Sequence, residues 1–167
     1  LIKLIVKQHR KKIKMRKSIP YGRQSISEDD IDAVIEVLRS DRLTQGPVIE
    51  KFEKKIASKC GSKFALSANS ATSSLHLSCK ALEIADNDIV WTTPITYVAT
   101  ANSAKFCNAE IDFVDIDEET FCMSSELLQE KLEKVKKLNK KIPKAIIPVH
   151  LAGHSCDMFN IKKLSDD

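Results

Sequence analysis

Small polar side chains gather just after a short apolar run in the first half of the chain. Phe64-Ala65-Leu66 precedes Asn69-Ser70-Ala71-Thr72, and apolar residues then recur at helical spacing. The first backbone N–H groups of a helix have no partners within it, and the helix dipole adds positive potential there. A phosphate can bind at such a start. The same hydroxyls could instead serve only as an ordinary helix cap, so two interpretations stay open.

Two more polar clusters follow apolar runs further along the chain. Thr92 to Tyr97 comes after Ile89-Val90-Trp91, and His150 to His154 comes after Ala145-Ile146-Ile147. If both runs are strands of one parallel sheet, their carboxyl ends meet at one edge, where such sheets bind ligands. His150 could act there as an acid or base. A hydrogen-bonded histidine at a strand end is the more ordinary reading, and we assign it no catalytic role.

Alternating strands and helices must position these clusters. Strands are expected over residues 63–68, 89–92, 111–114 and 145–150, and helices are expected to begin near residues 28, 47, 71, 96, 125 and 161. This alternation predicts an α/β fold, with three layers around a mostly parallel sheet. In the helix from Pro47, the spacing of Val48, Phe52 and Ile56 predicts a buried face. The lysines between residues 131 and 141 are expected to form a solvated face.

Composition favours one globular domain that follows a basic extension. The chain has 167 residues, 43% of them hydrophobic, and a formal net charge of +4. Residues 1–17 contain eight lysines and arginines and no acid, so the positive excess comes from this stretch. Such an arm could bind nucleic acid or an anionic membrane surface. A disordered extension with neither partner is our interpretation, and residues 18–167 are then the folded domain.

Cysteine and histidine spacing indicates neither a disulfide framework nor a metal site. The five cysteines lie at positions 60, 79, 107, 122 and 156, without a CxxC pair. An odd number at wide spacing is typical of reduced thiols in a cytoplasmic protein. The four histidines form no ligand pattern with them, so no metal is expected. Neither a signal peptide nor a membrane-spanning segment is expected from the apolar runs.

Five motifs occur along the chain in a characteristic order. They are Leu43-Thr44-Gln45-Gly46-Pro47, Asn69-Ser70-Ala71-Thr72-Ser73, the eleven residues from Thr92 to Asn102, Asp115-Ile116-Asp117, and Pro148-Val149-His150-Leu151-Ala152-Gly153. They resemble motifs of the DegT/StrS family of sugar-nucleotide aminotransferases, fold type I enzymes that use pyridoxal 5′-phosphate (PLP). The resemblance spans roughly residues 18–167. It implies a truncated, N-terminal part of the PLP-binding large domain, with an aspartate aminotransferase-like fold.

The resemblance also implies roles for particular residues. It implies that PLP is bound by Ser70, Ala71 and Thr72 at its phosphate and by Tyr97 at its pyridine ring. The alternative for Tyr97 is a core aromatic at the top of a strand. It implies that the nucleotide sugar is bound by five residues: Tyr21, Asp41, Arg42, Leu43 and Thr44. The planar cation of Arg42 suits a diphosphate, although Asp41 and Arg42 are equally typical of a solvated helix end.

The implied activity is transfer of an amino group from a donor, usually glutamate in this family, to the C4 keto group of a sugar. The motifs are most similar to those of enzymes that act on a UDP-linked 4-keto-6-deoxy-N-acetylhexosamine in bacterial surface-glycan and pseudaminic acid synthesis. A cytoplasmic homodimer is expected. Two alternatives stay open: another sugar-nucleotide aminotransferase of the family, and a non-catalytic relic or partner fragment.

The catalytic groups of the family fall outside the matching motifs. Its Schiff-base lysine and the Asp that faces the pyridine nitrogen lie in segments that would follow residue 167. No catalytic residue is therefore assigned in this sequence. The chain is expected to be inactive alone, because PLP-dependent transamination needs that lysine for covalent attachment and proton transfer.

Overall fold

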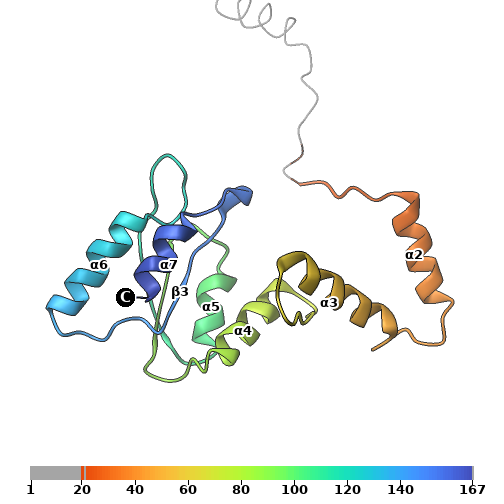
Figure 1. Ribbon diagram of the computed structural model, residues 1–167, viewed down its shortest axis with the longest axis horizontal. Coiled ribbons are helices and arrows are strands. Elements are labelled where there is room, and N and C mark those ends of the chain that lie inside the picture. Colours follow the sequence, from red (N-terminus) through yellow and green to blue (C-terminus); the bar gives the residue numbers. More distant parts are fainter. Residues whose placement is uncertain (1–19, 21, 167) are drawn as a thin grey trace, which may run out of the picture. The chain divides into compact units, whose positions relative to one another are not determined.

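The computed structural model describes residue 20 and residues 22–166, so the expected basic extension 1–17 and Tyr21 lie outside the described residues. The chain divides into two compact units, an N-terminal unit of residues 1–64 and a C-terminal unit of residues 65–167. Figure 1 follows the elements of both units along the sequence.

Two helices make up the described secondary structure of the N-terminal unit: α2 (Glu28–Leu38) and α3 (Pro47–Cys60). Ser27 caps α2 in a reciprocal arrangement, because its hydroxyl accepts from the Asp30 N–H at 3.3 Å while the Asp30 carboxylate accepts from the Ser27 N–H at 2.8 Å. Pro47 occupies the first position of α3, where a missing N–H costs nothing. Gly61 ends α3 in the left-handed region, at φ 64°.

The predicted buried face of α3 is wrong in this structure. Val48, Phe52 and Ile56 are all exposed, Phe52 by 55%. Ile31, Val34 and Leu38 of α2 are exposed as well. An apolar stripe shows which side of a helix seeks burial, but burial needs a second surface, and the described residues of the N-terminal unit supply none over these side chains.

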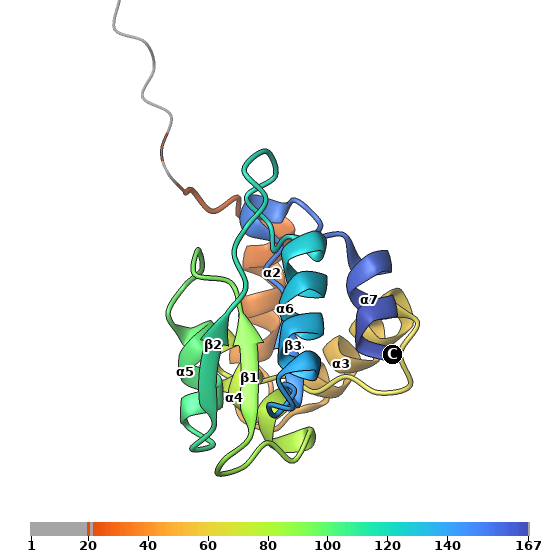
Figure 2. The same ribbon diagram turned by 90° about the vertical axis from the view of Figure 1, so that its left-hand side faces the viewer.

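The C-terminal unit is built around a parallel sheet in the order β2-β1-β3 (Figure 2). Its strands are β1 (Ile89–Thr92), β2 (Glu110–Phe113) and β3 (Ala145–Ile147). Its helices are α4 (Ala71–Ala81), α5 (Ala99–Lys105), α6 (Ser125–Lys137), the 3-10 turn η1 (Leu151–Gly153) and α7 (Met158–Asp166). Thr92 pairs with Phe113 on one side and Ile147 on the other, so the three strands end level.

Two apolar clusters cover opposite faces of this sheet. Trp91 packs with Leu128 of α6 and Ile161 of α7, whereas its neighbour Val90 packs with Cys79 of α4 and Ala104 of α5. Successive side chains of a strand point to opposite faces, which explains this division. Val90, Trp91 and Thr92 are almost completely buried. The three-layer α/β architecture predicted from the sequence is therefore confirmed.

The structure corrects the bounds of three predicted elements. Residues 63–68 form no strand, and Leu66 is 86% exposed. A strand needs a neighbour for its N–H and C=O groups, and no described strand lies beside this segment. The strand expected to reach His150 ends at Ile147, since Pro148 has no N–H to donate to a ladder. The helix expected from Thr96 begins at Ala99, and residues 93–98 form a loop instead.

Asp88 joins the start of β1 to the segment that leads into β3. Its carboxylate accepts from Lys144 Nζ at 2.9 Å, from Lys141 Nζ at 3.4 Å and from the Ala85 N–H at 3.0 Å. The Lys144 hydrogen bond, followed by that from Ala85, lowers the pKa of Asp88 below its ordinary value of 3.8. A carboxylate whose pKa is lowered on folding stabilises the fold above its ordinary pKa. That stabilisation is lost as the pH falls through the folded-state pKa.

We therefore expect Asp88→Asn to lower the midpoint of thermal unfolding near pH 7. The difference from the unchanged chain should shrink as the pH falls from about 5 to about 2, where Asp88 itself becomes neutral. Thermal unfolding followed by circular dichroism at several pH values measures this difference in midpoint. Asp86→Asn is the matched control, because no ion pair of Asp86 is found among the described residues. A difference that does not change with pH would contradict this origin.

Candidate functional site

The start of α4 combines a helix cap with free donors. Ser70 is the N-cap: its hydroxyl accepts from the Ser73 N–H at 3.2 Å, and the Ser73 hydroxyl donates to Asn69 Oδ1 at 2.7 Å. The cap uses only the third N–H of the helix. Within the described chain, the N–H groups of Ala71 and Thr72 have no hydrogen-bond partner. Capping and anion binding are thus compatible here, because different N–H groups serve each.

The electrostatics around this helix start favour an anion. Helices α2, α3 and α6 each have at least one acid in the first turn, whereas α4, like α5 and α7, has none. The sequence contains no Asp or Glu between Glu53 and Glu83. The positive end of the helix dipole is therefore not offset by a nearby carboxylate along the chain. Two free N–H groups and nearby hydroxyls on an exposed helix start form a donor set that suits the phosphate of PLP.

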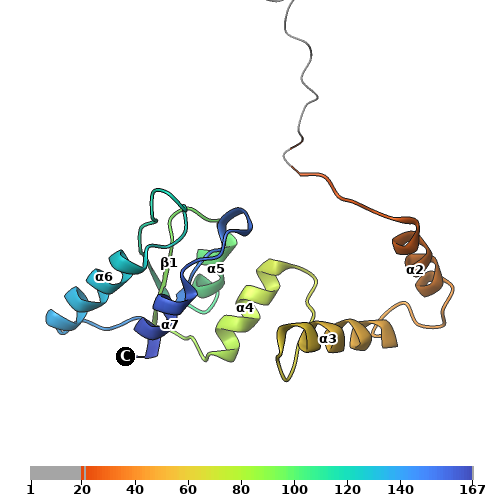
Figure 3. The ribbon, with the colours of Figure 1, turned by 45° about the horizontal axis from the view of Figure 1, so that its top comes forward.

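Packing against α5 fixes the position of α4 (Figure 3). The Cys79 thiol lies 3.6 Å from the Ser103 hydroxyl, and the rings of His76 and Phe106 meet edge to face at 5.4 Å. His76 thus has a packing role. Because α4 leads directly through a turn into the amino end of β1 and packs on the same side as α5, its own amino end faces the carboxyl edge of the sheet.

Tyr97 lies in the loop that leaves this carboxyl edge after β1. Its carbonyl accepts from the Thr100 N–H at 3.0 Å, and the hydroxyls of Thr96 and Thr100 lie 2.8 Å apart. The loop is thereby tied to the first turn of α5. The Tyr97 side chain is 77% exposed, which excludes the alternative of a core aromatic. An exposed ring held on an anchored loop is available to stack on a planar ligand.

Three of the proposed substrate residues line one hollow in the N-terminal unit. The hollow has a volume of about 880 Å³ and lies between the end of α2 and the start of α3. Asp41, Arg42 and Leu43 are among its lining residues, whereas Thr44 is not. Its charged lining consists of Glu36, Asp41, Arg42, Glu50 and Glu53. Arg42 is the only cation of that lining, so an anionic ligand in this hollow would depend on it.

Gly46 allows the chain to turn tightly beside this hollow. A Cβ at that position would lie 3.1 Å from the Arg42 carbonyl oxygen and 3.4 Å from the Arg42 Cβ. The 3.1 Å separation is tighter than most Cβ contacts, so a side chain at this position would require the Arg42 carbonyl to shift by a few tenths of an ångström.

His150 makes a structural hydrogen bond. Its Nδ1 accepts from the Cys156 N–H at 3.0 Å, which holds the loop after β3 in a closed form. A neutral His150 must then carry its proton on Nε2. This arrangement agrees with the ordinary reading of a hydrogen-bonded histidine.

Two features of the site region were not foreseen from the sequence. Lys131, expected on a solvated face, pairs with Asp112 at 2.7 Å and lies 4.6 Å from the centre of the Trp91 ring, so that expectation is wrong for this residue. Thr93 is fully buried, and its hydroxyl has no hydrogen-bond partner in the part of the chain that the structure describes. Neither residue lies in a pattern of charge or hydropathy that marks such a role in advance.

Among residues 20 and 22–166, no group of three or more His, Cys, Asp or Glu side chains is arranged to hold a metal ion. No helix in that range combines the length and the apolar character needed to cross a bilayer.

The chain is similar to sugar aminotransferases over most of its length. Residues 24–167 match the DegT/DnrJ/EryC1/StrS aminotransferase family. The chain is 37% identical over 147 residues to the UDP-4-amino-4,6-dideoxy-N-acetyl-beta-L-altrosamine transaminase of Campylobacter jejuni, covering 88% of this chain and 38% of that protein. The chain spans 34–38% of the length of the curated relatives that it matches.

Solved structures give the same result. A Helicobacter pylori aminotransferase involved in the biosynthesis of pseudoaminic acid is 32% identical, with a TM-score of 0.75, over 90% of this chain and 39% of that one. The Streptococcus pneumoniae protein Spr1654 in its PLP form is 30% identical, with a TM-score of 0.76, over 87% of this chain and 36% of that one.

Proposed function

Because the chain belongs to the DegT/DnrJ/EryC1/StrS aminotransferase family, whose cofactor is PLP, we propose that it forms the phosphate-binding part of a sugar-nucleotide aminotransferase. The observation that carries this proposal is the start of α4, where two backbone N–H groups are free and no acid is nearby in the sequence. A phosphate dianion gains from both the free donors and the helix dipole.

The chain's own residues have binding and positioning roles in this proposal. The N–H groups of Ala71 and Thr72 and the hydroxyls of Ser70 and Thr72 would hold the phosphate. The exposed Tyr97 ring would be available to stack on the pyridine. When bound, PLP supplies the electron sink that lets an amino group leave a donor and join a keto sugar. No lysine in this sequence is assigned as the covalent link to PLP.

We further propose that the substrate is a UDP-linked 4-keto-6-deoxy-N-acetylhexosamine, which receives its C4 amino group from glutamate. The similarity to the Campylobacter jejuni and Helicobacter pylori proteins supports this substrate and a place in pseudaminic acid or other surface-glycan synthesis. Arg42 would meet the diphosphate, and Asp41, Leu43, Thr44 and Tyr21 would lie around the nucleotide sugar. Another sugar-nucleotide substrate is the alternative within the family.

We propose that the active enzyme is a homodimer in the cytoplasm. The apolar side chains of α2 and α3 that are exposed within the N-terminal unit support an assembly, since such a surface is seldom left uncovered on a monomer. The odd number and wide spacing of the five cysteines in the sequence favour a cytoplasmic location. Light scattering coupled to size-exclusion chromatography tests the assembly of any preparation that turns over substrate.

A binding experiment separates the phosphate role from catalysis. Pyridoxamine 5′-phosphate has no aldehyde, so it does not react with surface lysines. We expect it to bind the 167-residue chain in equilibrium dialysis and to be displaced by inorganic phosphate. Pyridoxamine without the phosphate should bind at least about 10-fold more weakly, because it lacks the charge-assisted hydrogen bonds. Equal binding of the two amines would reject the phosphate role and favour a non-catalytic relic.

We also expect the chain alone to convert no UDP-linked keto sugar with glutamate and PLP. The physical reason is that PLP-dependent transamination needs a lysine for covalent attachment and proton transfer, and we assign none of the lysines in this sequence to that role. Chromatography of the nucleotide sugars measures the conversion of keto sugar to amino sugar. The Campylobacter jejuni relative is the positive control. Steady turnover by the chain alone would contradict this expectation, although it would leave the phosphate role intact.

A further inference from the structure

Two buried thiols meet between the loops that follow β2 and β3. Cys122 and Cys156 both belong to the apolar cluster around Trp91. The Cys122 thiol donates to the His154 carbonyl at 3.4 Å, and the Cys156 thiol donates to the Val149 carbonyl at 3.1 Å. Both sulfurs therefore lie beside the one short segment of residues 149–156, inside the same buried cluster.

The backbone holds each cysteine in place from its own loop. Ile116 bridges to Met123, and the Asp117 N–H donates to the Cys122 carbonyl at 2.9 Å, which closes the first loop. The hydrogen bond from the Cys156 N–H to His150 closes the second. The thiol pair is thus fixed by two independently closed loops, not by chance contact of mobile side chains.

The remaining cysteines do not share this arrangement. Cys60 is exposed at the end of α3, in the N-terminal unit. Cys79 and Cys107 belong to the cluster on the opposite face of the sheet, where Cys79 contacts the Ser103 hydroxyl. Cys122 and Cys156 are therefore the pair that the fold presents to each other across two loops.

We propose that Cys122 and Cys156 form a reversible disulfide when the protein meets a small oxidised disulfide such as glutathione disulfide. The Cys122 thiol loses its proton, attacks one sulfur of glutathione disulfide, and releases one glutathione. Cys156 then loses its proton and displaces the second glutathione from Cys122. Two protein thiols become one disulfide, and one glutathione disulfide becomes two glutathione thiols, so atoms and electrons balance.

The local chemistry makes this reaction slow until a loop opens. Both thiols are at most 4% exposed, and burial, followed by the nearby Cys122 thiol, raises the pKa of Cys156. Phe121, next to Cys122, and Ala152 both have a positive φ without being glycine, which strains the two loops. Local opening of a strained loop is easier than unfolding of the sheet, and it gives the oxidant access.

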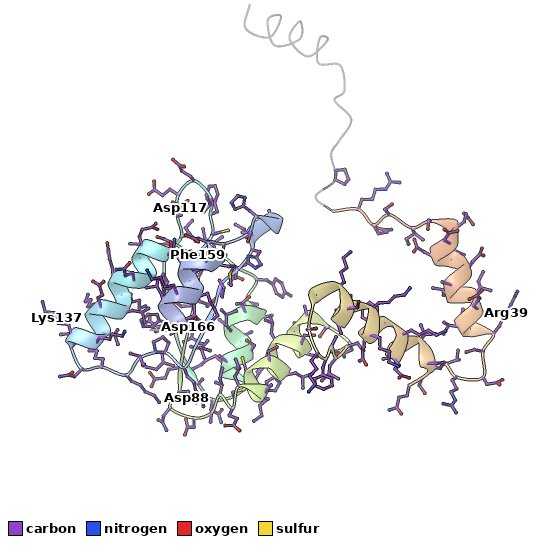
Figure 4. The ribbon with its side chains drawn as sticks, in the orientation of Figure 1. Arg39, Asp88, Asp117, Lys137, Phe159 and Asp166 are labelled. Carbon is purple, nitrogen blue, oxygen red and sulfur yellow. The ribbon has the colours of Figure 1, made fainter. Side chains whose placement is uncertain are left out.

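The disulfide would tie together two segments at the carboxyl edge of the sheet. Figure 4 shows Asp117, in the loop after β2, at the opposite end of this unit from Asp88, which precedes β1. The new bond would enclose residues 123–155, which include α6 and β3. Closing a loop of this size restricts the unfolded chain and so raises stability. Oxidation would therefore stiffen the edge on which the proposed cofactor site lies.

The experiment uses the 167-residue chain in glutathione buffers of increasing oxidised fraction. After acid quenching and alkylation of free thiols, peptide mass spectrometry should find Cys122 joined to Cys156 as the main intramolecular link. The same treatment in strong denaturant should give a broad mixture of pairings. The oxidised native chain should melt at least about 5 °C higher than the reduced chain.

Single variants sharpen this test. Cys156→Ala and Cys122→Ala should leave the remaining partner as a glutathione adduct, whereas Cys107→Ala should not change the Cys122–Cys156 link. If these variants fail to fold, comparing the native and denatured wild-type chain still shows whether the native fold favours the Cys122–Cys156 link. The proposal is overturned if the native chain keeps both thiols free at an oxidised fraction that modifies Cys60, or if it pairs them no more often than the denatured chain.

Discussion

Replacing Ala71 by proline is expected to weaken binding of pyridoxamine 5′-phosphate by about 10- to 150-fold while leaving α4 intact. The substitution removes one free N–H from the first position of the helix, where proline is well tolerated. Ser70, just before it, already has the extended backbone that a following proline requires, with φ −160° and ψ 157°. A hydrogen bond to a charged group contributes about 1.5–3 kcal/mol, which corresponds to that loss in affinity.

The control for this variant is the same substitution at another helix start. Glu28→Pro occupies the first position of α2, whose N-cap Ser27 is also extended, and it should leave the affinity unchanged. Equilibrium dialysis measures binding, and circular dichroism checks that helix content is retained. If Ala71→Pro and the unchanged chain bind equally well, the N–H groups of α4 do not hold the phosphate, and the cap interpretation alone is sufficient.

Truncating Trp91 to alanine is expected to destabilise the C-terminal unit by about 3–5 kcal/mol. Trp91 is 1% exposed, sits on the central strand, and packs with Leu128 and Ile161 from two helices. Lys131 also loses the ring over which its ammonium group lies. Because a domain of ordinary size is stable by only about 5–15 kcal/mol, this loss should unfold much of the population at moderate urea concentration.

Two further variants define the origin of that effect. Trp91→Phe keeps an apolar ring and should cost distinctly less than Trp91→Ala, because the cavity is smaller. Phe159→Ala removes a large side chain that is 81% exposed, so it should change the free energy of unfolding by no more than about 0.5 kcal/mol. Urea unfolding followed by circular dichroism suits all three, since Trp91 is the only tryptophan. A Trp91→Ala chain as stable as the Phe159→Ala chain would show that the core does not depend on this ring.

Local sequence rules predicted the starts of α2, α3, α4 and α6 well, because a helix is capped by its own neighbours. Ser27 with Asp30, Pro47 at the start of α3, and Gly61 at its end all act within a few residues. The order of strands and helices was likewise sufficient for the three-layer fold. Two of the failures depend on a partner elsewhere in the chain. Residues 63–68 form no strand because no described strand lies beside them, and Phe52 is exposed because no described element of the N-terminal unit covers it.

The sequence by itself determined the family, the helix start that suits a phosphate, and the aromatic loop that follows β1, because short motifs carry these features. Tertiary structure alone decided that Tyr97 is exposed, that Lys131 contacts Trp91 and Asp112, and that Cys122 and Cys156 share one buried cluster. Those contacts join residues far apart in the chain. Their distances are set by the packing of helices on the sheet, and no local pattern of residue types encodes them.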